Sequence, residues 1–454
     1  MSSSTAAITP LTAGGAPQVG FATFAVSELG YEEAEYTLAG TARAYERTGD
    51  GVTAVEEADY ATRILVYRPA DPARFNGTVW VEWFNVSGGA DAGPDWIFTH
   101  TELARSGAAW VGVSAQAIGV QGGEGLVGMA SPGLVGTDPE RYGHLVHPGD
   151  RFSYDMFSRA GAAVRQAGNT ILDGLTIERV LAIGESQSAF RLTTYANDID
   201  PVAQVFDGFL VHARGGTGAP LDDNADPAAA LQGDPVQFRA DRRVPVMCVE
   251  AETDLLALGY LGARQDDDDS FALWEIAGTS HADVYIFAVG AIDTGSVPIA
   301  DLARAWTPSD EFMEMRLDLP VNAGPQHYVM NAAVSCFDRW VRDGTRPPAS
   351  PRLEVVDGAF VTDEHGNVRG GIRTPHVDVP TAVLSGFGNG GAPIAFLSGS
   401  TTPFSDEQLA ALYPTRDEYL ARYAAATDAA VASGFVLAAD AEEIKAIAAA
   451  NCPL

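Results

Sequence analysis

The stretch that decides the fold reads Val180-Leu181-Ala182-Ile183-Gly184-Glu185-Ser186-Gln187-Ser188. Its first four residues form a short apolar run typical of a buried strand, and a helical pattern follows at 189–199. A serine between two such elements predicts a sharp strand-to-helix turn, where the residues two positions to either side must be small. Gly184 meets this requirement, and Ser188 stands where the usual pattern has a second glycine. The motif is therefore G-x-S-x-S, a small departure from G-x-S-x-G.

Strand-like and helical segments alternate around this turn over the first 345 residues. This alternation predicts an α/β fold with a mostly parallel central sheet flanked by helices. Strands are expected at 61–67, 78–83, 109–114, 180–183, 208–212, 244–249 and 271–276. Helices are expected at 152–167 and at 326–342, where apolar pairs recur every four residues.

Two segments interrupt this alternation and are candidates for lids over a site, namely 115–150 and 284–325. A proline-rich connection follows Gly344, so we assign 1–345 to a catalytic domain and 346–454 to a C-terminal extension. Capping-box patterns predict three helices in the extension, starting at Ser405/Gln408, Thr415/Glu418 and Asp440/Glu443. Their apolar stripes indicate that the extension packs on the catalytic domain.

Composition excludes several classes of partner. The 454-residue chain has a formal net charge of −32 at pH 7, which argues against binding to nucleic acid or to anionic membranes. No stretch approaches the roughly 20 apolar residues of a membrane span, and the N-terminus lacks the pattern of a signal peptide. An odd number of cysteines, three, fits a reducing compartment. We therefore expect a cytoplasmic protein, and the sequence leaves its oligomeric state open, a homo-oligomer included.

A serine hydroxyl is a weak nucleophile at neutral pH, so Ser186 would need a base within hydrogen-bond reach and an acid to orient that base. His281 is the best-placed base, because it lies in the turn after the predicted strand 271–276. In this architecture the order along the chain is serine, acid, histidine, which places the acid after the strand 244–249. Asp254 is the predicted acid, and Glu252 is the alternative.

An oxyanion would be stabilised by backbone N–H groups near Ser186. Gln187 supplies the first candidate, at the start of the helix, and Val86 or Ser87 supplies the second, in the glycine-containing loop after 78–83. Aromatic and histidine side chains near these loops are candidates for a substrate pocket that would favour bulky apolar groups. They are Trp83, Phe84, Trp96, Tyr285 and His327.

Together these motifs resemble the α/β-hydrolase superfamily over roughly residues 20–345. The stretches 81–89, 152–155, 184–189, 252–255, 277–283 and 324–328 are similar to a bacterial, serine esterase-like branch of α/β-hydrolase-domain proteins with a G-E-S-Q-S turn. The resemblance implies hydrolysis of carboxylic esters as the commonest activity, and it does not imply a particular substrate.

The sequence thus predicts a serine carboxylic-ester hydrolase that acts on a small-molecule ester through an acyl-enzyme, without a cofactor. The same three residues would also serve an acyltransferase or an amide or thioester hydrolase, since fold and triad do not fix the reaction. A non-catalytic ligand-binding module with this fold is a further alternative.

Two other patterns have simpler explanations. His144 and His147 are three residues apart, but no cysteine or carboxylate cluster accompanies them, so no metal site is predicted. Residues 386–391 match G-x-G-x-x-G, but the strand-like run 392–397 follows them in place of a helix. A hairpin or a lid loop is therefore expected there.

Overall fold

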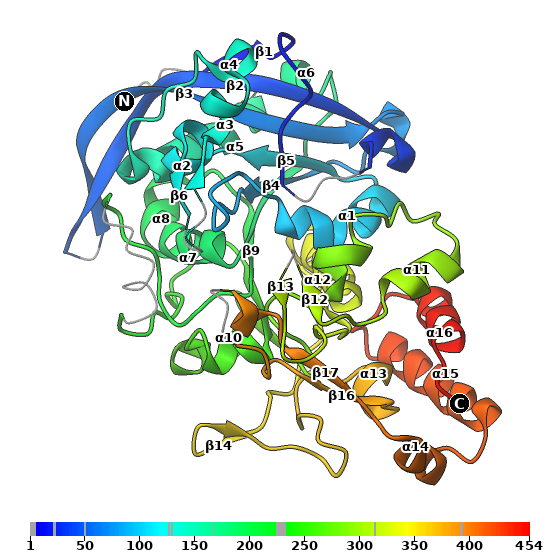
Figure 1. Cartoon of the computed structure of the whole chain (residues 1–454). Coiled ribbons are helices and arrows are strands. Elements are labelled where there is room, and N and C mark those ends of the chain that lie inside the picture. The colour runs from blue at the N-terminus through cyan, green and yellow to red at the C-terminus, as the bar shows by residue number, and fades with distance from the viewer. Residues whose placement is uncertain are drawn as a thin grey trace.

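The computed structural model describes residues 6–20, 24–49, 51–125, 128, 130–166, 168–223, 233–312, 315–390 and 394–454. Within these ranges a nine-stranded sheet has the order β1-β2-β3-β5-β4-β8-β9-β10-β11 (Figure 1). Neighbouring strands are parallel from β5 onwards in this order, whereas β1, β2 and β3 form an antiparallel edge. The predicted α/β fold with a mostly parallel sheet is confirmed.

The parallel strands agree closely with the prediction. They are β4 (Thr78–Trp83), β5 (Ala109–Val113), β8 (Arg179–Glu185), β9 (Gly208–His212), β10 (Val246–Ala251) and β11 (Phe271–Ile276). Every residue of these six strands is buried, as expected for a parallel sheet covered on both faces.

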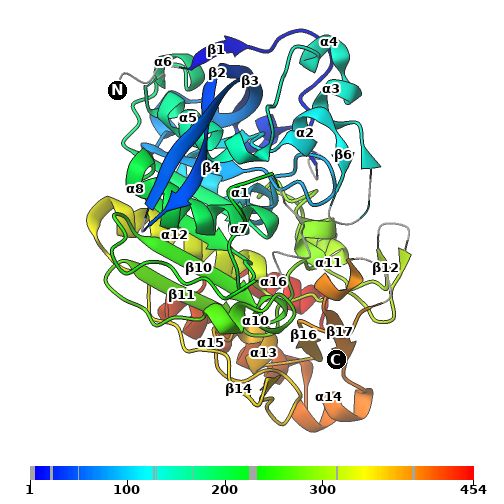
Figure 2. The ribbon, with the colours of Figure 1, turned by 90° about the vertical axis from the view of Figure 1, so that its left-hand side faces the viewer.

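The antiparallel edge consists of β1 (Ala7–Pro10), β2 (Tyr31–Thr48) and β3 (Gly51–Pro69). Only the part of β3 at 61–67 was predicted. β2 is rich in alanine and glutamate, which have low strand propensity, and its pairing with β3 holds it in the sheet. In Figures 1 and 2 this hairpin lies at the opposite end of the molecule from the C-terminal helices.

Helices cover both faces of the sheet. On one face lie α1 (Pro94–Ser106) and α12 (Gln326–Asp343), and on the other lie α5 (Ser153–Gln166) and α7 (Gln187–Thr194). Short helices complete the connections: α6 (Gly168–Ile171), α8 (Asp200–Ala203) and α10 (Glu252–Leu256). Side chains alternate between the two faces along each strand, so that Trp80 joins one apolar core and Val79 and Val81 join the other.

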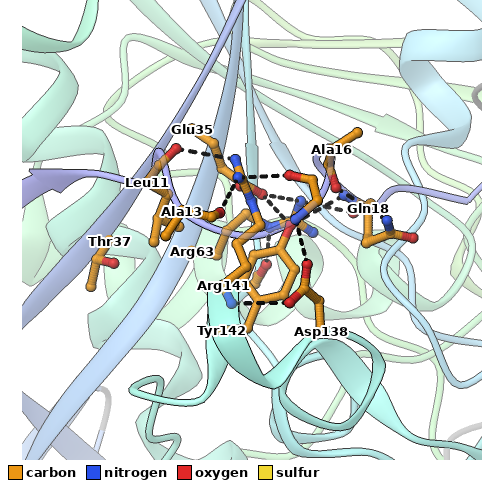
Figure 3. Close-up of polar contacts among 12 residues, drawn as sticks. Leu11, Ala13, Ala16, Gln18, Glu35, Thr37, Arg63, Asp138, Arg141 and Tyr142 are labelled. Atoms are coloured by element: carbon orange, nitrogen blue, oxygen red, sulfur yellow. Dashed lines mark hydrogen bonds and ion pairs between the residues drawn. The ribbon is translucent and has the colours of Figure 1, made fainter.

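A buried ionic cluster ties the N-terminal segment to the antiparallel edge (Figure 3). Glu35 accepts hydrogen bonds from Arg63 at 3.2 Å and from Arg141 at 2.6 Å. Arg141 also donates to the carbonyl oxygens of Leu11 and Ala13. Each buried charge is paired and hydrogen-bonded, so these contacts offset the free-energy cost of removing the charges from water. The cluster thereby fixes the N-terminal segment against β2.

The two segments predicted as lids contain short elements. Segment 115–150 forms α2 (Ala117–Gln121), β6 (Gly123–Glu124), β7 (Ala130–Ser131), α3 (Gly133–Thr137) and α4 (Pro139–Tyr142). Segment 284–325 forms a π-helical turn (Tyr285–Val289), α11 (Ile299–Ala305), β12 (Glu311–Phe312) and β13 (Met315–Arg316). Their function as lids stays a prediction.

The C-terminal extension contains two hairpins and four helices within the described ranges. They are β14 (Val355–Val356) with β15 (Ala359–Phe360), α13 (Pro375–Asp378), β16 (Ala382–Ser385) with β17 (Ser400–Pro403), α14 (Asp406–Leu412), α15 (Arg416–Ala432) and α16 (Ala441–Ala450). Most of its buried apolar side chains join the core on the α1 and α12 face, and Leu353, Val368, Val377 and Leu384 join the core on the other face. The division of the chain at 345 stays a prediction.

Details of the extension differ from the sequence-based expectation. The strand predicted at 392–397 is wrong in its second half, because Ala395–Leu397 is a 3-10 turn. Its first two residues, 392 and 393, lie outside the described residues. The described part of the glycine-rich run, 386–390, lies in the connection of the β16–β17 hairpin, as expected. Ser405 forms a reciprocal capping box, Thr415 caps its helix without one, and Asp440 makes no capping side-chain bond.

No helix in the described ranges is both long and apolar enough to cross a membrane.

Candidate active site

Ser186 lies at the turn between β8 and α7, as predicted. Its backbone has φ 56° and ψ −121°, a conformation that non-glycine residues rarely adopt and that costs on the order of 1–3 kcal/mol. The N–H of Ser186 donates to the carbonyl oxygen of His212 at 3.0 Å, and the Ser186 carbonyl accepts from Phe190. The neighbouring strand and the first helical turn therefore hold the strained residue in place.

The small residues around Ser186 allow this close approach. A Cβ atom at Gly184 would lie 3.0 Å from Leu192 Cδ1 and 3.3 Å from Ser188 Cβ. At the second small position, the buried hydroxyl of Ser188 donates to the carbonyl oxygen of Glu185 at 2.7 Å. Serine is therefore accommodated in place of glycine, with its hydroxyl satisfied.

Ser186, His281 and Asp254 form a continuous chain of contacts. His281 Nε2 lies 2.8 Å from Ser186 Oγ, and His281 Nδ1 lies 2.6 Å from Asp254 Oδ1. The second oxygen of Asp254 accepts from the N–H of Ala251 at 2.6 Å, which orients the carboxylate at the end of β10. Both Asp254 and His281 are buried. With the proton on Nδ1, Nε2 can accept a hydrogen bond from the Ser186 hydroxyl.

Glu252, the alternative acid, has another position. Its two carboxylate oxygens accept from the backbone N–H groups of Gly278 at 2.6 Å and Gly386 at 2.8 Å. Burial raises the pKa of Glu252 to about 7. Asp254, and not Glu252, contacts the imidazole, and Glu252 instead joins the His281 loop to the C-terminal extension.

A second carboxylate faces the imidazole of His281. Glu185 Oε1 lies 3.3 Å from His281 Nε2. Burial would lower the pKa of His281, but the carboxylates of Asp254 and Glu185 outweigh it and raise the pKa above its usual value. Burial also raises the pKa of Glu185 to about 7, against the opposing effect of His281.

The loop after β4 is tied to the serine turn by Asn85. Its Nδ2 donates to the Glu185 carbonyl oxygen at 3.2 Å and to Glu185 Oε2 at 3.1 Å. The backbone of Asn85 pairs with Ala92 in both directions. Asp91, next to Ala92, is held in turn by Arg63 at 2.7 Å. The buried ionic cluster thus extends to the loop that faces Ser186.

The predicted oxyanion donors differ in availability. Within the described part of the chain, the N–H groups of Gln187 and Val86 have no hydrogen-bond partner, so neither is engaged elsewhere in the protein. The N–H of Ser87 is already engaged by Asn85 Oδ1 at 2.8 Å. Of the two alternatives in this loop, Val86 therefore has the free donor and Ser87 does not.

A second buried histidine lies beside the turn. His212 Nδ1 is 2.9 Å from Asp95 Oδ1, and its Nε2 is 3.1 Å from the side-chain amide of Gln326. Burial lowers the pKa of His212 to about 4 and raises that of Asp95 well above its usual value. His212 is therefore neutral near pH 7, and its backbone carbonyl holds Ser186.

Three of the aromatic residues predicted for the pocket lie in the hydrophobic interior. Trp83 joins the core beneath α5, and its Nε1 donates to Gln116 at 3.1 Å. Phe84 lies under the Arg63 guanidinium, and Trp96 packs in the core on the opposite face from Trp83. Neighbouring side chains cover their rings, and their place in a substrate pocket stays a prediction.

Tyr285 and His327 are also buried, and they pack against each other. Their rings are stacked with centroids 3.7 Å apart. His327 Nδ1 lies 2.7 Å from the carbonyl oxygen of Phe98, and burial lowers the pKa of His327 to about 3. These contacts give His327 a structural function, joining α12 to α1.

His144 and His147, for which no metal site is predicted, have separate contacts. His144 contacts Thr37, and His147 contacts the Ala115 carbonyl. Across the described ranges, no group of three or more His, Cys, Asp or Glu side chains is arranged to hold a metal ion.

Sequence reasoning gave no function to Glu185, Asn85 and His212, although each lies at or just beyond the carboxyl end of a parallel strand. A charged or polar residue that ends an otherwise apolar strand was the available signal. It indicates the sheet edge where ligands bind, but it does not say which partner each side chain meets.

A mostly parallel sheet with a serine at a strand-to-helix turn defines the α/β-hydrolase class of fold. The sequence matches the family model described as "Alpha/beta hydrolase domain" over residues 5–446, so this chain belongs to that family. The match extends across position 345 into the C-terminal extension. A comparison with curated protein sequences gives no match.

Solved structures similar to this chain include several esterases. Esterase Est22 is 14% identical, with 57% of this chain and 75% of that chain covered and a TM-score of 0.33. A thermostable esterase from Pseudomonas putida is 13% identical, with 61% and 80% covered and a TM-score of 0.31. A fungal esterase from Rhizomucor miehei is 10% identical, with 54% and 78% covered and a TM-score of 0.28. Similarities this low carry no argument about activity or substrate.

Proposed function

We propose that this protein is a serine carboxylic-ester hydrolase that acts on a small-molecule ester. The observation that carries the proposal is the contact chain in which His281 lies 2.8 Å from Ser186 Oγ and 2.6 Å from Asp254. These distances match the requirement for a nucleophile, a base and an orienting acid.

In the proposed reaction, Ser186 Oγ attacks the ester carbonyl carbon while His281 Nε2 accepts the hydroxyl proton. Asp254 holds the proton on Nδ1, so that the tautomer with a free Nε2 is the resting one. The tetrahedral intermediate collapses when imidazolium gives its proton to the leaving alcohol, which leaves an acyl-enzyme. Water then attacks the acyl group by the same steps and releases the carboxylic acid and free Ser186.

The oxyanion of each tetrahedral intermediate would accept hydrogen bonds from the N–H groups of Gln187 and Val86. Each such donor contributes on the order of 3 kcal/mol to transition-state stabilisation. Gln187 is the first residue of α7, so its N–H also lies at the positive end of a helix dipole. The reaction needs no cofactor.

The test is covalent labelling followed by turnover. Wild-type protein and Ser186→Ala are treated with a fluorophosphonate, and intact masses are recorded. We expect one adduct on the wild type and none on the variant, together with hydrolysis of p-nitrophenyl acetate by the wild type alone. Equal turnover by Ser186→Ala would contradict the mechanism. Product analysis with a competing alcohol present distinguishes hydrolysis from acyl transfer.

A further inference from the structure

The imidazole of His281 contacts a carboxylate at each ring nitrogen. Asp254 lies 2.6 Å from Nδ1, and Glu185 lies 3.3 Å from Nε2. Nε2 is also the nitrogen that contacts Ser186 Oγ. A triad needs only the acid at Nδ1, so the carboxylate at Nε2 requires a separate explanation.

Glu185 is held in this position from its other side. Asn85 Nδ2 donates to Glu185 Oε2 at 3.1 Å, which leaves Oε1 directed at His281. The Glu185 side chain is 6% exposed, and no Lys or Arg contacts it within the described residues. His281 is therefore its neighbouring cationic partner when the imidazole is protonated.

We propose that Glu185 is a positioning residue that stabilises the imidazolium form of His281 and thereby sets, with Asp254, the pH at which the catalytic base becomes active. This inference rests on the proposed serine-hydrolase function. During the reaction, the proton taken from Ser186 resides on Nε2, 3.3 Å from Glu185 Oε1, so an ionised Glu185 stabilises the state in which that proton is held.

The direction of the effect follows from charge. An ionised Glu185 favours the protonated imidazole, so His281 loses its proton at a higher pH than it would with a neutral neighbour. The other titratable groups that act on this pair are Asp254 from α10, His212 from β9 and Asp95 from α1. Because Glu185 and His281 interact closely, their two protons leave in macroscopic steps that belong to the pair.

Three variants test the inference. Glu185→Gln removes the charge and keeps an oxygen that can accept from Asn85. Glu185→Asp keeps the charge on a shorter side chain. Glu252→Gln is the matched control, since Glu252 is also buried and also has its pKa raised to about 7. Its carboxylate accepts from the backbone of Gly278 and Gly386 and, within the described residues, does not contact His281.

The direct readout is the titration of His281 by NMR of protein labelled at histidine Cε1, with the resonance assigned from His281→Asn. We expect Glu185→Gln to lower the midpoint by on the order of 1 pH unit or more. Glu185→Asp should retain most of the wild-type value, and Glu252→Gln should leave it unchanged. The acid limb of kcat/KM for p-nitrophenyl acetate should move to lower pH with Glu185→Gln by the same amount.

An unchanged His281 midpoint in Glu185→Gln would overturn the inference, whatever the activity. If that variant does not fold, Glu185→Ala is titrated with the same two outcomes. If the His281 midpoint shifts between the variants as expected but the wild type has no turnover, the proposed function is contradicted and this inference is not. The two failures are therefore distinguishable.

Discussion

Ser188 Oγ donates a hydrogen bond of 2.7 Å to the carbonyl oxygen of Glu185, which joins the two sides of the serine turn. Ser188→Gly restores the commoner G-x-S-x-G pattern and removes this buried bond. We expect it to lower the free energy of unfolding by about 1–2 kcal/mol, through the lost bond and the added backbone freedom. Urea unfolding measures this loss, and Ser188→Ala, which keeps the Cβ, isolates the contribution of the bond.

Esterase activity should be largely retained in both Ser188 variants, because the side chain contacts neither Ser186 Oγ nor His281. A loss of activity much greater than the loss of stability would contradict a purely structural function for the Ser188 hydroxyl.

Asn85 connects the loop of Val86, one of the two proposed oxyanion donors, to the serine turn. Asn85→Ala removes the bonds to Glu185 and frees the N–H of Ser87, so the loop and the N–H of Val86 lose their fixed position. Misplacement of this kind costs about 100-fold in rate, and we expect a loss of that size in kcat/KM. Fluorophosphonate labelling should still occur, more slowly. Unchanged kinetics would show that the loop is held by its backbone bonds to Ala92 alone.

Substitution of the two candidate acids, Asp254 and Glu252, should affect kcat differently. Asp254→Asn removes the acceptor that keeps the proton on His281 Nδ1, so the wrong tautomer becomes populated and kcat falls by about 10⁴-fold. Glu252→Gln leaves the tautomer unaffected and weakens the backbone contacts of Gly278 and Gly386. Kinetics and thermal unfolding of both variants decide between the acids. A larger loss of kcat in Glu252→Gln would reverse the assignment.

The parallel part of the fold could be predicted because buried parallel strands are nearly continuous apolar runs. Three strands, at 78–83, 208–212 and 271–276, have the predicted bounds. The order of the loops that carry Ser186, Asp254 and His281 follows from the order of their strands, and the structure brings these three side chains together. Their catalytic roles stay a prediction until the variants are measured.

The parts that sequence reasoning missed depend on contacts distant in sequence. Trp83 is the last residue of β4, and only the strand register decides that its ring enters the core beneath α5. The N–H of Ser87 was one of the predicted oxyanion donors, but it already donates to the side chain of Asn85. The strand β2 depends on its pairing with β3 and on the burial of Glu35 by two arginines.

Glu443 links stability to pH. Burial raises its pKa to about 7 from an ordinary value near 4.5, so the folded state binds this proton more tightly than the unfolded state does. Its contribution to stability is therefore full below pH 4.5 and is lost as pH rises to about 7. Glu443→Gln keeps an acceptor for the Tyr328 hydroxyl, 3.0 Å away, and removes the titration.

We expect Glu443→Gln to gain stability relative to the wild type between pH 4.5 and 7, by on the order of 3 kcal/mol across the window. Urea unfolding of both proteins at matched pH values measures the difference. Exposed Glu442→Gln, one residue earlier on α16, is the control for loss of a carboxylate from this helix. A flat difference for Glu443→Gln would show that its carboxyl is ordinary in the folded protein.

A fragment ending at residue 345 tests the predicted domain division. Trp306 and Tyr328 stack with centroids 5.3 Å apart in the same core as Tyr423 and Ile444 of the C-terminal extension, so truncation would expose them. The His281 loop would also lose contacts, because the N–H of Ala282 donates to the Leu397 carbonyl at 3.0 Å.

We therefore expect the fragment 1–345 to aggregate or to unfold without cooperativity, and to resist fluorophosphonate labelling at Ser186. Size-exclusion chromatography, calorimetry and intact mass measure these three properties. Residues 346–454 supplied as a separate chain should restore labelling, because the missing surface is then provided in trans. A monomeric 1–345 fragment that unfolds cooperatively and is labelled as fast as the full chain would establish 345 as a true domain boundary and make the extension dispensable for the active site.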